Sequence, residues 1–187
     1  MTEKEKRDQG LWYDANFDEE LLAERMEAER KVFRLNALAP DQGEERAAAL
    51  GDLLGRCGSD VEVLAPLNVD YGYNVSIGEA SFINHNAYLM DGAPIAIGSH
   101  VFIGPYCGMY TAQHPLTAAE RNAGLERALP ITVEDDVWIG ANVTILPGVT
   151  IGAGSVVLRD VPAGVVAAGN PCRVVREITE ADRPRDA

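Results

Sequence analysis

Aliphatic residues recur at a strict interval of six in the stretch ITVEDDVWIGANVTILPGVTIGAGSVV, residues 131–157. Two interleaved sets carry the pattern: Val133, Ile139, Ile145, Ile151 and Val157, and Ile131, Val137, Val143 and Val149. Neither the period of an α-helix nor that of a β-strand explains this spacing by itself. A unit of one short strand and one tight turn does, and it is typical of a parallel β-helix. Six residues also leave no room for the crossover helix of an ordinary parallel sheet.

The same rhythm extends back to Val61, with two interruptions. At DGAP, Asp91–Pro94, the register slips by two residues, an insertion that belongs in a turn. Between residues 111 and 130 the rhythm lapses, yet Met109 and Val133 are 24 residues apart, four times six. We therefore expect a loop at 111–130 that replaces or protrudes from coils, and not a separate domain.

The first 60 residues follow a different pattern. From Asp18 to Leu38, apolar residues fall on one face of an amphipathic helix, and glutamates near its start suit the helix dipole. A second helix follows Asp41 and is ended by Gly55 and Gly58. The sequence thus predicts a mainly β protein with an N-terminal helical cap at 1–60, a parallel β-helix domain at 61–178, and a C-terminal tail at 179–187.

The formal net charge of −13 argues against two broad classes of partner. Nucleic acid and anionic lipid would repel so acidic a protein, and binding would gain little from counterion release. The N-terminal sequence MTEKEKRDQG is charged and lacks the apolar segment of a signal peptide, and no run approaches 18 apolar residues. We expect a cytoplasmic protein without membrane attachment. Its cysteines, Cys57, Cys107 and Cys172, form no CxxC pair, and we expect them to be reduced.

The three histidines, His85, His100 and His114, are the first candidates for chemistry. A zinc hydratase on this scaffold would need ligands that converge on one metal, but the histidines are 15 and 14 residues apart and no carboxylate–His–His cluster occurs. We therefore expect no metal site. His114 differs because it lies in the segment that breaks the rhythm, and loops on a rigid scaffold often carry catalytic groups. A surface histidine without function is an equal alternative at this point.

Six motifs in chain order carry a resemblance to a known family: GLWYDAN, DYGYNVSIG, NHNAYLMD, YTAQHP, PITVEDDVWIGANVTILPGVTIG and VVAAGNPCRVVREI. Together they resemble the maltose and galactoside O-acetyltransferases of the hexapeptide-repeat acyltransferase superfamily, over nearly the whole chain. The resemblance implies a left-handed β-helix and a homotrimer with active sites between protomers. It also implies acetyl-CoA as the co-substrate and a small hydroxyl compound, such as a sugar, as the acceptor.

His114 matches the family's catalytic histidine, which acts as a general base on a sugar hydroxyl. A hydroxyl attacks a thioester poorly until a base takes its proton, and a neutral imidazole can contribute about 10²–10⁴ in rate. The proton then passes to the leaving thiolate, so no cysteine need be catalytic. Glu126 lies in the same loop and is a candidate to orient the imidazole, with a solvated loop charge as the alternative.

Four further positions match the acceptor side of the family pattern. Asp70 and Asn84 correspond to residues that line the acceptor pocket, although an asparagine in NHN could also be a turn residue. Asp91 lies next to another acceptor-contacting position, where Gly92 replaces a second acid. Trp138, in VWIG, corresponds to an indole beside the acyl-transfer site, and packing against a neighbouring protomer is compatible with that role. The N-terminal residues 13–16 resemble the segment that closes over the acceptor.

The CoA side of the resemblance rests on small residues and arginines. The matching positions are Ala141, Ala153 and Gly154 for the pantetheine arm, and Arg159, Arg173 and Arg176 for the nucleotide end. Small residues permit close approach of the backbone, and arginines attract phosphates. Arg173 and Arg176 can point to one side if their segment turns helically. The alternative for such arginines is a solubilising tail.

One departure from the family pattern is a missing hexapeptide. After PGVTIG the chain runs directly from Gly152 into Ala153-Gly154-Ser155. Six residues form one side of a coil, so we expect the strands beyond this point to be rotated by about a third of a turn unless the chain compensates. Such a rotation would alter the CoA contacts. It also keeps a second function open, that of a non-catalytic β-helix serving as a structural or assembly subunit.

Overall fold

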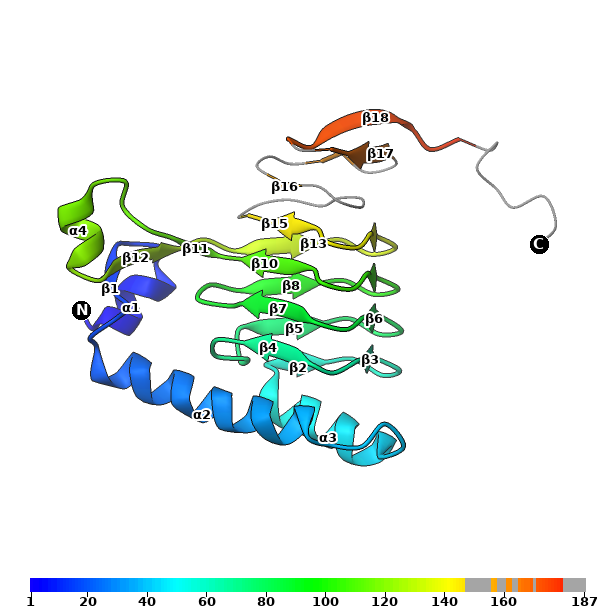
Figure 1. Ribbon diagram of the computed structural model, residues 1–187, viewed down its shortest axis with the longest axis horizontal. Helices are drawn as coiled ribbons and strands as arrows, with labels where there is room; N and C mark the ends of the chain where they lie inside the picture. Colours follow the sequence, from blue (N-terminus) through cyan, green and yellow to red (C-terminus); the bar gives the residue numbers. More distant parts are fainter. Residues whose placement is uncertain (147–155, 158–160, 163–164, 170, 180–187) are drawn as a thin grey trace.

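The structure, a computed structural model, describes residues 1–146, 156–157, 161–162, 165–169 and 171–179. It shows a stack of short parallel strands, with two helices below the stack and an arm projecting from one side (Figure 1). Among the described helices, none combines the length and apolar character that a membrane crossing would require.

Three parallel sheets form the sides of the coil, and each gains one strand from successive turns of the chain (Figure 1). The first contains β2 (Arg56–Cys57), β5 (Val75–Ile77), β8 (Ile95–Ile97) and β13 (Ile131–Val133). The second contains β3 (Glu62–Val63), β6 (Phe82–Ile83), β9 (Phe102–Ile103) and β14 (Trp138–Ile139). The third contains β4 (Leu67–Val69), β7 (Ala87–Met90), β10 (Gly108–Tyr110), β15 (Thr144–Ile145) and β16 (Val156–Val157).

The predicted aliphatic ladder fills the interior of this coil. Alternate residues of a strand point to opposite faces, so each strand turns one or two apolar side chains inward. Each such side chain contributes about 1.5–3 kcal/mol when fully buried, which lets the coil hold together without disulfides. The described ladder residues that are almost fully buried include Ile77, Ile83, Leu89, Ile95, Ile103, Ile131, Ile139, Val143 and Ile145.

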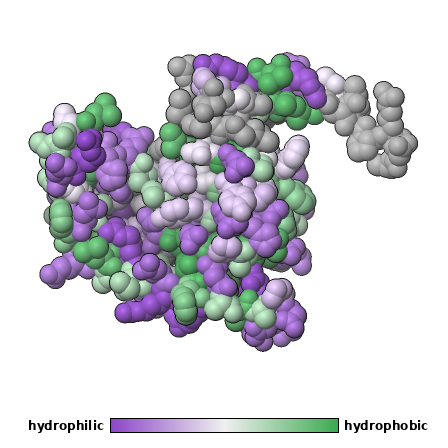
Figure 2. Space-filling model, in the orientation of Figure 1, coloured by the Kyte–Doolittle hydropathy of each residue, from purple (hydrophilic) through white to green (hydrophobic). Residues whose placement is uncertain are grey.

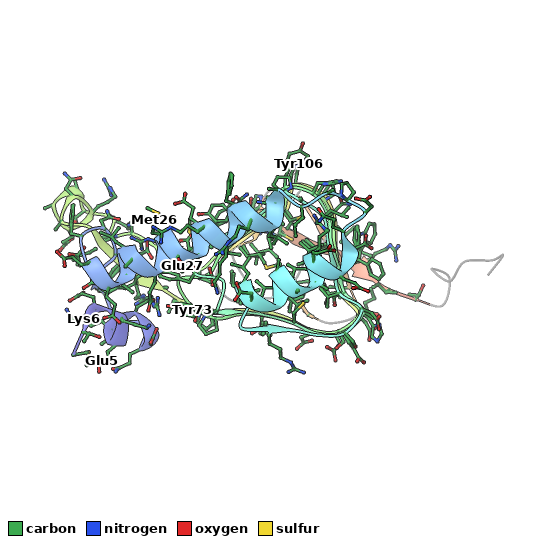
Figure 3. All side chains as sticks on the ribbon, turned by 90° about the horizontal axis from the view of Figure 1, so that it is seen from below. Glu5, Lys6, Met26, Glu27, Tyr73 and Tyr106 are labelled. Atoms are coloured by element: carbon green, nitrogen blue, oxygen red, sulfur yellow. The ribbon has the colours of Figure 1, made fainter. Side chains whose placement is uncertain are left out.

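Two helices, α2 (Glu19–Asn36) and α3 (Gly43–Leu53), cover the lower end of the coil, as the view from below shows (Figure 3). Val32, Leu50 and Leu53 belong to the same apolar cluster as the coil interior. Asn36 pairs with the backbone of Leu67 twice, donating to its carbonyl at 2.8 Å and accepting from its N–H at 3.0 Å. These bonds satisfy polar groups of the lowest strand in the third sheet, which would otherwise be an open edge.

The lower turns of the coil repeat every 20 residues, because Cys57 pairs with Ile77 and Ile77 with Ile97. Three sides of six residues account for all but two residues of each turn. These two additional residues lie at the corner that follows the third sheet. One slip is the predicted slip at DGAP. The second register slip lies next to Tyr71. The six-residue spacing does not reveal it, because Tyr71 is apolar and occupies a position at which the aliphatic pattern expects an apolar residue. Tyr71 instead leaves the coil and joins a second buried cluster with Tyr13, Ala15, Leu21, Ala93 and Ala128.

At the next turn of the coil, the chain leaves the scaffold at the same corner and forms the arm before it returns to β13. The arm consists of β11 (Ala112–Gln113), α4 (Ala118–Asn122) and β12 (Leu125–Ala128), so residues 111–130 have secondary structure of their own. Near the N-terminus, β1 (Tyr13–Asp14) pairs antiparallel with β12. The result is a small sheet in the order β1-β12-β11, standing beside the coil at the left of Figure 1.

A buried arginine fastens the first helix, α1 (Glu3–Asp8), to the corner of the coil. The Arg7 side chain is 1% exposed, and its guanidinium lies 4.6 Å from the centre of the Tyr71 ring. It donates to the Tyr73 hydroxyl at 2.9 Å and to the Asp8 carboxylate at 2.7 Å. Figure 3 shows Tyr73 beside α1, which carries Lys6. The N-terminal segment is therefore held by a charge that is both paired and hydrogen-bonded, as a buried charge requires.

The missing hexapeptide does not rotate the next strand out of its sheet. Thr144 of β15 pairs with Val156 of β16, twelve residues later, and both belong to the third sheet. The expected rotation by a third of a turn is therefore not found at β16. Further on, β17 (Val165–Ala168) and β18 (Arg173–Glu177) form an antiparallel pair.

Candidate active site

His114 lies in the arm, directly after β11, with 46% of its side chain exposed. Its Nδ1 is 3.1 Å from the carbonyl oxygen of Leu125 on β12. A carbonyl oxygen can only accept a hydrogen bond, so the ring proton belongs on Nδ1 and Nε2 carries the lone pair. The arm therefore presents an imidazole with its basic nitrogen available to a ligand.

Glu126 stands on the Nε2 side of this imidazole. Its Oε2 is 3.8 Å from Nε2 of His114, and only 16% of its side chain is exposed. Its Oε1 accepts a hydrogen bond from the hydroxyl of Tyr13, a fully buried residue of β1. Burial and the nearby Glu126 charge raise the pKa of Tyr13, so the phenol keeps its proton and continues to donate.

The geometry bears on both sequence interpretations of Glu126, whose Oε2 lies within ion-pair distance of Nε2 of His114. The group that orients the imidazole through Nδ1 is the carbonyl of Leu125, a backbone atom to which side-chain patterns give no clue. Nor is Glu126 a solvated loop charge, because Tyr13 holds its carboxylate in a mostly buried position. Contact between Tyr13 and Glu126 depends on pairing between strands 113 residues apart, and sequence reasoning missed it.

Asp91 has a different role from the one expected. Its side chain is completely buried, and Oδ1 accepts the backbone N–H groups of Asp70 and Tyr71 at 3.0 and 2.8 Å. Oδ2 faces the N–H of Asn74 at 3.3 Å. Burial raises the pKa of Asp91 to about 6. Asp91 thus links the corner at residues 91–94 to the corner at residues 70–74 in the turn below. The direct contact with an acceptor that the sequence suggested for Asp91 is corrected to a role in supporting these corners.

Gly92 lies beside the pair formed by Tyr13 and Glu126. A Cβ atom at position 92 would lie 3.4 Å from the Tyr13 hydroxyl and 3.5 Å from Oε1 of Glu126. An acid here, as the family pattern allows, would crowd and repel the Glu126 carboxylate. The glycine leaves that space to the pair formed by Tyr13 and Glu126.

Asp70 lies at the same corner as the arm, at the end of β4. It is partly buried and accepts a hydrogen bond of 2.6 Å from the hydroxyl of Tyr88. Burial raises the pKa of its carboxyl group. The Tyr88 ring meets Tyr110 edge to face, with ring centres 5.8 Å apart. The structure therefore gathers Asp70 and the His114 arm at one end of the third sheet.

Asn84 and Trp138 lie elsewhere in the single chain. Asn84 is at the opposite end of the third sheet, before the corner that leads into β7, and the four residues of β7, roughly 13 Å of extended chain, separate that corner from the corner of Asp91. Trp138 is 73% exposed on the second sheet, in register with Phe102. In Figure 1 the second sheet lies on the side of the coil away from the arm. One chain by itself does not bring these two residues to His114.

The predicted CoA contacts are only partly described. Ala141 lies at the corner after β14 and stacks closely on the turn below, since a Cβ at Gly104 would be 2.7 Å from its nitrogen. Ala153, Gly154 and Arg159 lie outside the described residues. Among the described residues, no three or more histidine, cysteine, aspartate or glutamate side chains gather in a way that could hold a metal ion.

Arg173 and Arg176 lie in a strand, which corrects the helical turn considered from their spacing. Three residues apart in a regular strand, they would point to opposite faces. However, Arg173 is opposite Ala168 and Arg176 is opposite Val166, because a bulge inserts one extra residue into β18. Positions 166 and 168 share a face, so the bulge returns both arginines to one side of the ribbon.

Figure 2 shows the molecule in the orientation of Figure 1. The surface on this side is mostly hydrophilic, with hydrophobic residues in separate spots. Two family models match parts of the chain: the maltose acetyltransferase hexapeptide capping motif matches residues 6–58, which include the N-terminal helices, and the bacterial transferase hexapeptide (six repeats) matches residues 130–158, the upper part of the coil.

Solved structures show the same architecture over nearly the full chain. A maltose O-acetyltransferase from Clostridium difficile is 42% identical, with a TM-score of 0.92 and coverage of 96% of this chain and 99% of that one. A galactoside acetyltransferase in complex with coenzyme A is 34% identical, with a TM-score of 0.92 and coverage of 97% and 94%. A hexapeptide-repeat acetyltransferase from Vibrio cholerae, complexed with acetyl coenzyme A, is 40% identical, with a TM-score of 0.83 and coverage of 96% and 100%.

These likenesses define the coil as a left-handed parallel β-helix with N-terminal helices, which confirms the fold expected from the sequence. The chain belongs to the maltose and galactoside O-acetyltransferase family of the hexapeptide-repeat acyltransferases.

Proposed function

We propose that this chain is an acetyl-CoA-dependent O-acetyltransferase that acts on a hydroxyl of a sugar or a related small molecule, with His114 as the general base. The observation that carries the proposal is the hydrogen bond from Nδ1 of His114 to the carbonyl of Leu125, which leaves Nε2 free to accept a proton. The donor is inferred from relatives solved with coenzyme A and acetyl coenzyme A, and the acceptor class from relatives that are maltose and galactoside acetyltransferases.

The proposed reaction is a direct attack without a covalent enzyme intermediate. The acceptor hydroxyl donates to Nε2, and its oxygen attacks the thioester carbonyl as the proton moves to the imidazole. The tetrahedral intermediate then collapses, the carbon–sulfur bond breaks, and the imidazolium returns the proton to the thiolate. The Leu125 carbonyl holds the Nδ1–H throughout and favours the cationic ring.

We further propose that the active site is completed between protomers of a homotrimer. Asn84 and Trp138 lie far from His114 within one chain, and the Trp138 indole is 73% exposed. In a trimer, Asn84 and Trp138 of the partner subunit could complete the acceptor and acyl-transfer sides. Arg173 and Arg176, on one side of the β17-β18 ribbon, would attract the phosphates of CoA.

Release of CoA from acetyl-CoA is the direct test of the activity. With a panel of maltose, methyl galactosides and other polyhydroxyl compounds, we expect at least one acceptor to raise the release rate about tenfold or more above the rate with water alone. Thiol formation measured with a chromogenic disulfide gives the rate, and mass spectrometry confirms the acetylated acceptor. A non-catalytic structural subunit would release CoA at the same low rate with every member of the panel.

Arg173→Ala and Arg176→Ala should each weaken CoA binding by about five- to thirtyfold, because each removes a charge-assisted contact of roughly 1–2 kcal/mol. Titration calorimetry with CoA measures the dissociation constants. Arg30→Ala, which removes an exposed arginine on α2 paired with Glu27, serves as the control for loss of positive charge. Dissociation constants within twofold of the unaltered protein for both variants would show that these arginines do not contact the phosphates.

A further inference from the structure

We propose that Glu126 determines acceptor specificity: its carboxylate accepts a hydrogen bond from a second hydroxyl of the acceptor, one or two carbon atoms from the hydroxyl that His114 deprotonates. This inference rests on the proposed function. It assigns to Glu126 a role toward the acceptor rather than toward the imidazole.

The first support is the position of two hydrogen-bond acceptors side by side. Nε2 of His114 carries a lone pair because Nδ1 donates to Leu125, and Oε2 of Glu126 can only accept while the carboxylate is ionised. The two atoms are 3.8 Å apart, which is too long for a hydrogen bond between them. A ligand that carries two neighbouring donors satisfies both atoms at once, and a 1,2- or 1,3-diol has that arrangement.

The second support is the way Glu126 is held. The side chain is only 16% exposed, and Oε1 is occupied by the hydroxyl of Tyr13, so the carboxylate is anchored through one oxygen with the other directed toward Nε2. Tyr13 and Glu126 are directly opposite each other in the β1-β12 pair. Gly92 places no side chain beside Oε1, to which an added Cβ atom would come within 3.5 Å. A carboxylate positioned this firmly loses little further freedom when a ligand binds, which favours selectivity.

The third support is the energetic consequence of closing the site. A partly buried carboxylate oxygen that loses water on acceptor binding must gain a donor, or the complex bears the cost of desolvation. A simple alcohol offers its only proton to His114 and leaves Oε2 of Glu126 without one. Sites built to bond a substrate hydroxyl therefore discriminate strongly against analogues that lack it. Acceptors with an anionic group at that place would be repelled.

The test uses methyl α-D-glucopyranoside and methyl β-D-galactopyranoside, each with its monodeoxy and mono-O-methyl derivatives. The acetylated position is located by nuclear magnetic resonance, and kcat/KM is measured for each compound with saturating acetyl-CoA. With the unaltered protein, loss of the hydroxyl nearest the acetylated position should lower kcat/KM by about a hundredfold. The O-methyl derivative should lose as much, because an ether cannot donate.

Glu126→Gln is the decisive variant, because it keeps the shape of the side chain and an oxygen that can accept from Tyr13. It should lower kcat/KM for the parent glycoside by about a hundredfold but change kcat/KM for the deoxy derivative less than threefold. Glu126→Met, which removes all polarity at similar volume, should give the same selective loss. Glu120→Gln on α4 is the control for loss of an acidic side chain in the same arm, and unfolding midpoints verify that each variant is folded.

Three results would overturn the inference, and they differ from failure of the proposed function. Equal kcat/KM for parent and deoxy acceptors in the unaltered protein would show that no second hydroxyl is recognised. An equal loss for parent and deoxy acceptors in Glu126→Gln would assign Glu126 to stabilisation of the imidazolium. A selective loss already present in Glu120→Gln would show a general charge effect. No transfer to any glycoside by the unaltered protein would instead contradict the proposed function itself.

Discussion

His114→Ala is expected to lower kcat for acetyl transfer by about 10³, within the range of 10²–10⁴ typical of a general base. Without the imidazole, the acceptor hydroxyl must lose its proton to water while it attacks the thioester. The half-exposed ring makes one hydrogen bond to the arm, so the fold should survive its loss. Steady-state thiol release measures kcat, and calorimetry should show CoA binding unchanged within twofold.

The control for this variant is His100→Asn. His100 adopts a left-handed backbone with φ of 56°, a conformation that asparagine tolerates better than alanine does. It lies at a corner of the coil away from the arm, and we expect its kcat to stay within twofold. Added imidazole should partly restore the activity of His114→Ala, because it can occupy the space left by the ring. Unchanged turnover in His114→Ala would refute the proposed base.

Gly78→Ala should destabilise the coil by about 3 kcal/mol or more, the upper range for overpacking a well-packed interior. Gly78 follows β5 at a corner where successive turns stack directly. A Cβ atom there would lie 2.5 Å from both the carbonyl carbon of Gly98 and the nitrogen of Ser99. Both obstructing atoms are backbone, so no side chain can move aside and the two turns must separate. The midpoint of thermal unfolding should fall by roughly 10 °C.

Gly51→Ala is the matched control, the same substitution at a position with free space. Gly51 lies within α3, and an added Cβ would meet nothing within 4 Å. Alanine is a better helix former than glycine, so this variant should be more stable by about 0.5–1 kcal/mol. Thermal unfolding followed by circular dichroism measures both variants. Equal midpoints for Gly78→Ala and the unaltered protein would show that the corners of the coil are not in tight contact.

The fold could be predicted because the six-residue aliphatic repeat is visible within short stretches of sequence and is typical of one structure, the parallel β-helix. A residue such as Ile139 or Ile145 recurs at six because each side of the coil places one residue at the same depth in the interior. The same logic found the slip at Asp91–Pro94. The six-residue spacing did not reveal the register slip beside Tyr71. An apolar residue at that position fits the repeat whether its side chain packs inside the coil or, as here, in the second cluster.

Only part of the candidate site could be predicted from the sequence. His114 could be singled out because a break in the repeat marks where the chain leaves the scaffold, and Asp70 lies at the same corner. Asp91 could not be interpreted correctly, since nothing in a sequence distinguishes a carboxylate that bonds backbone N–H groups from one that faces a ligand. Arg173 and Arg176 were expected on one side of a helical turn, and a bulge in β18 produces the same alignment.

The sequence by itself determined the repeating coil, the helical cap and the break in the repeat that contains His114, because periodicity and turn residues act between neighbours in the chain. Only the tertiary structure decided which groups surround this histidine. The Leu125 carbonyl selects the protonated nitrogen of His114, and the Tyr13 hydroxyl fixes the Glu126 carboxylate beside the other nitrogen. These contacts depend on the pairing of β1 with β12 across more than a hundred residues. Hydrogen bonds of that kind are set by distance and direction in space, which sequence spacing does not record.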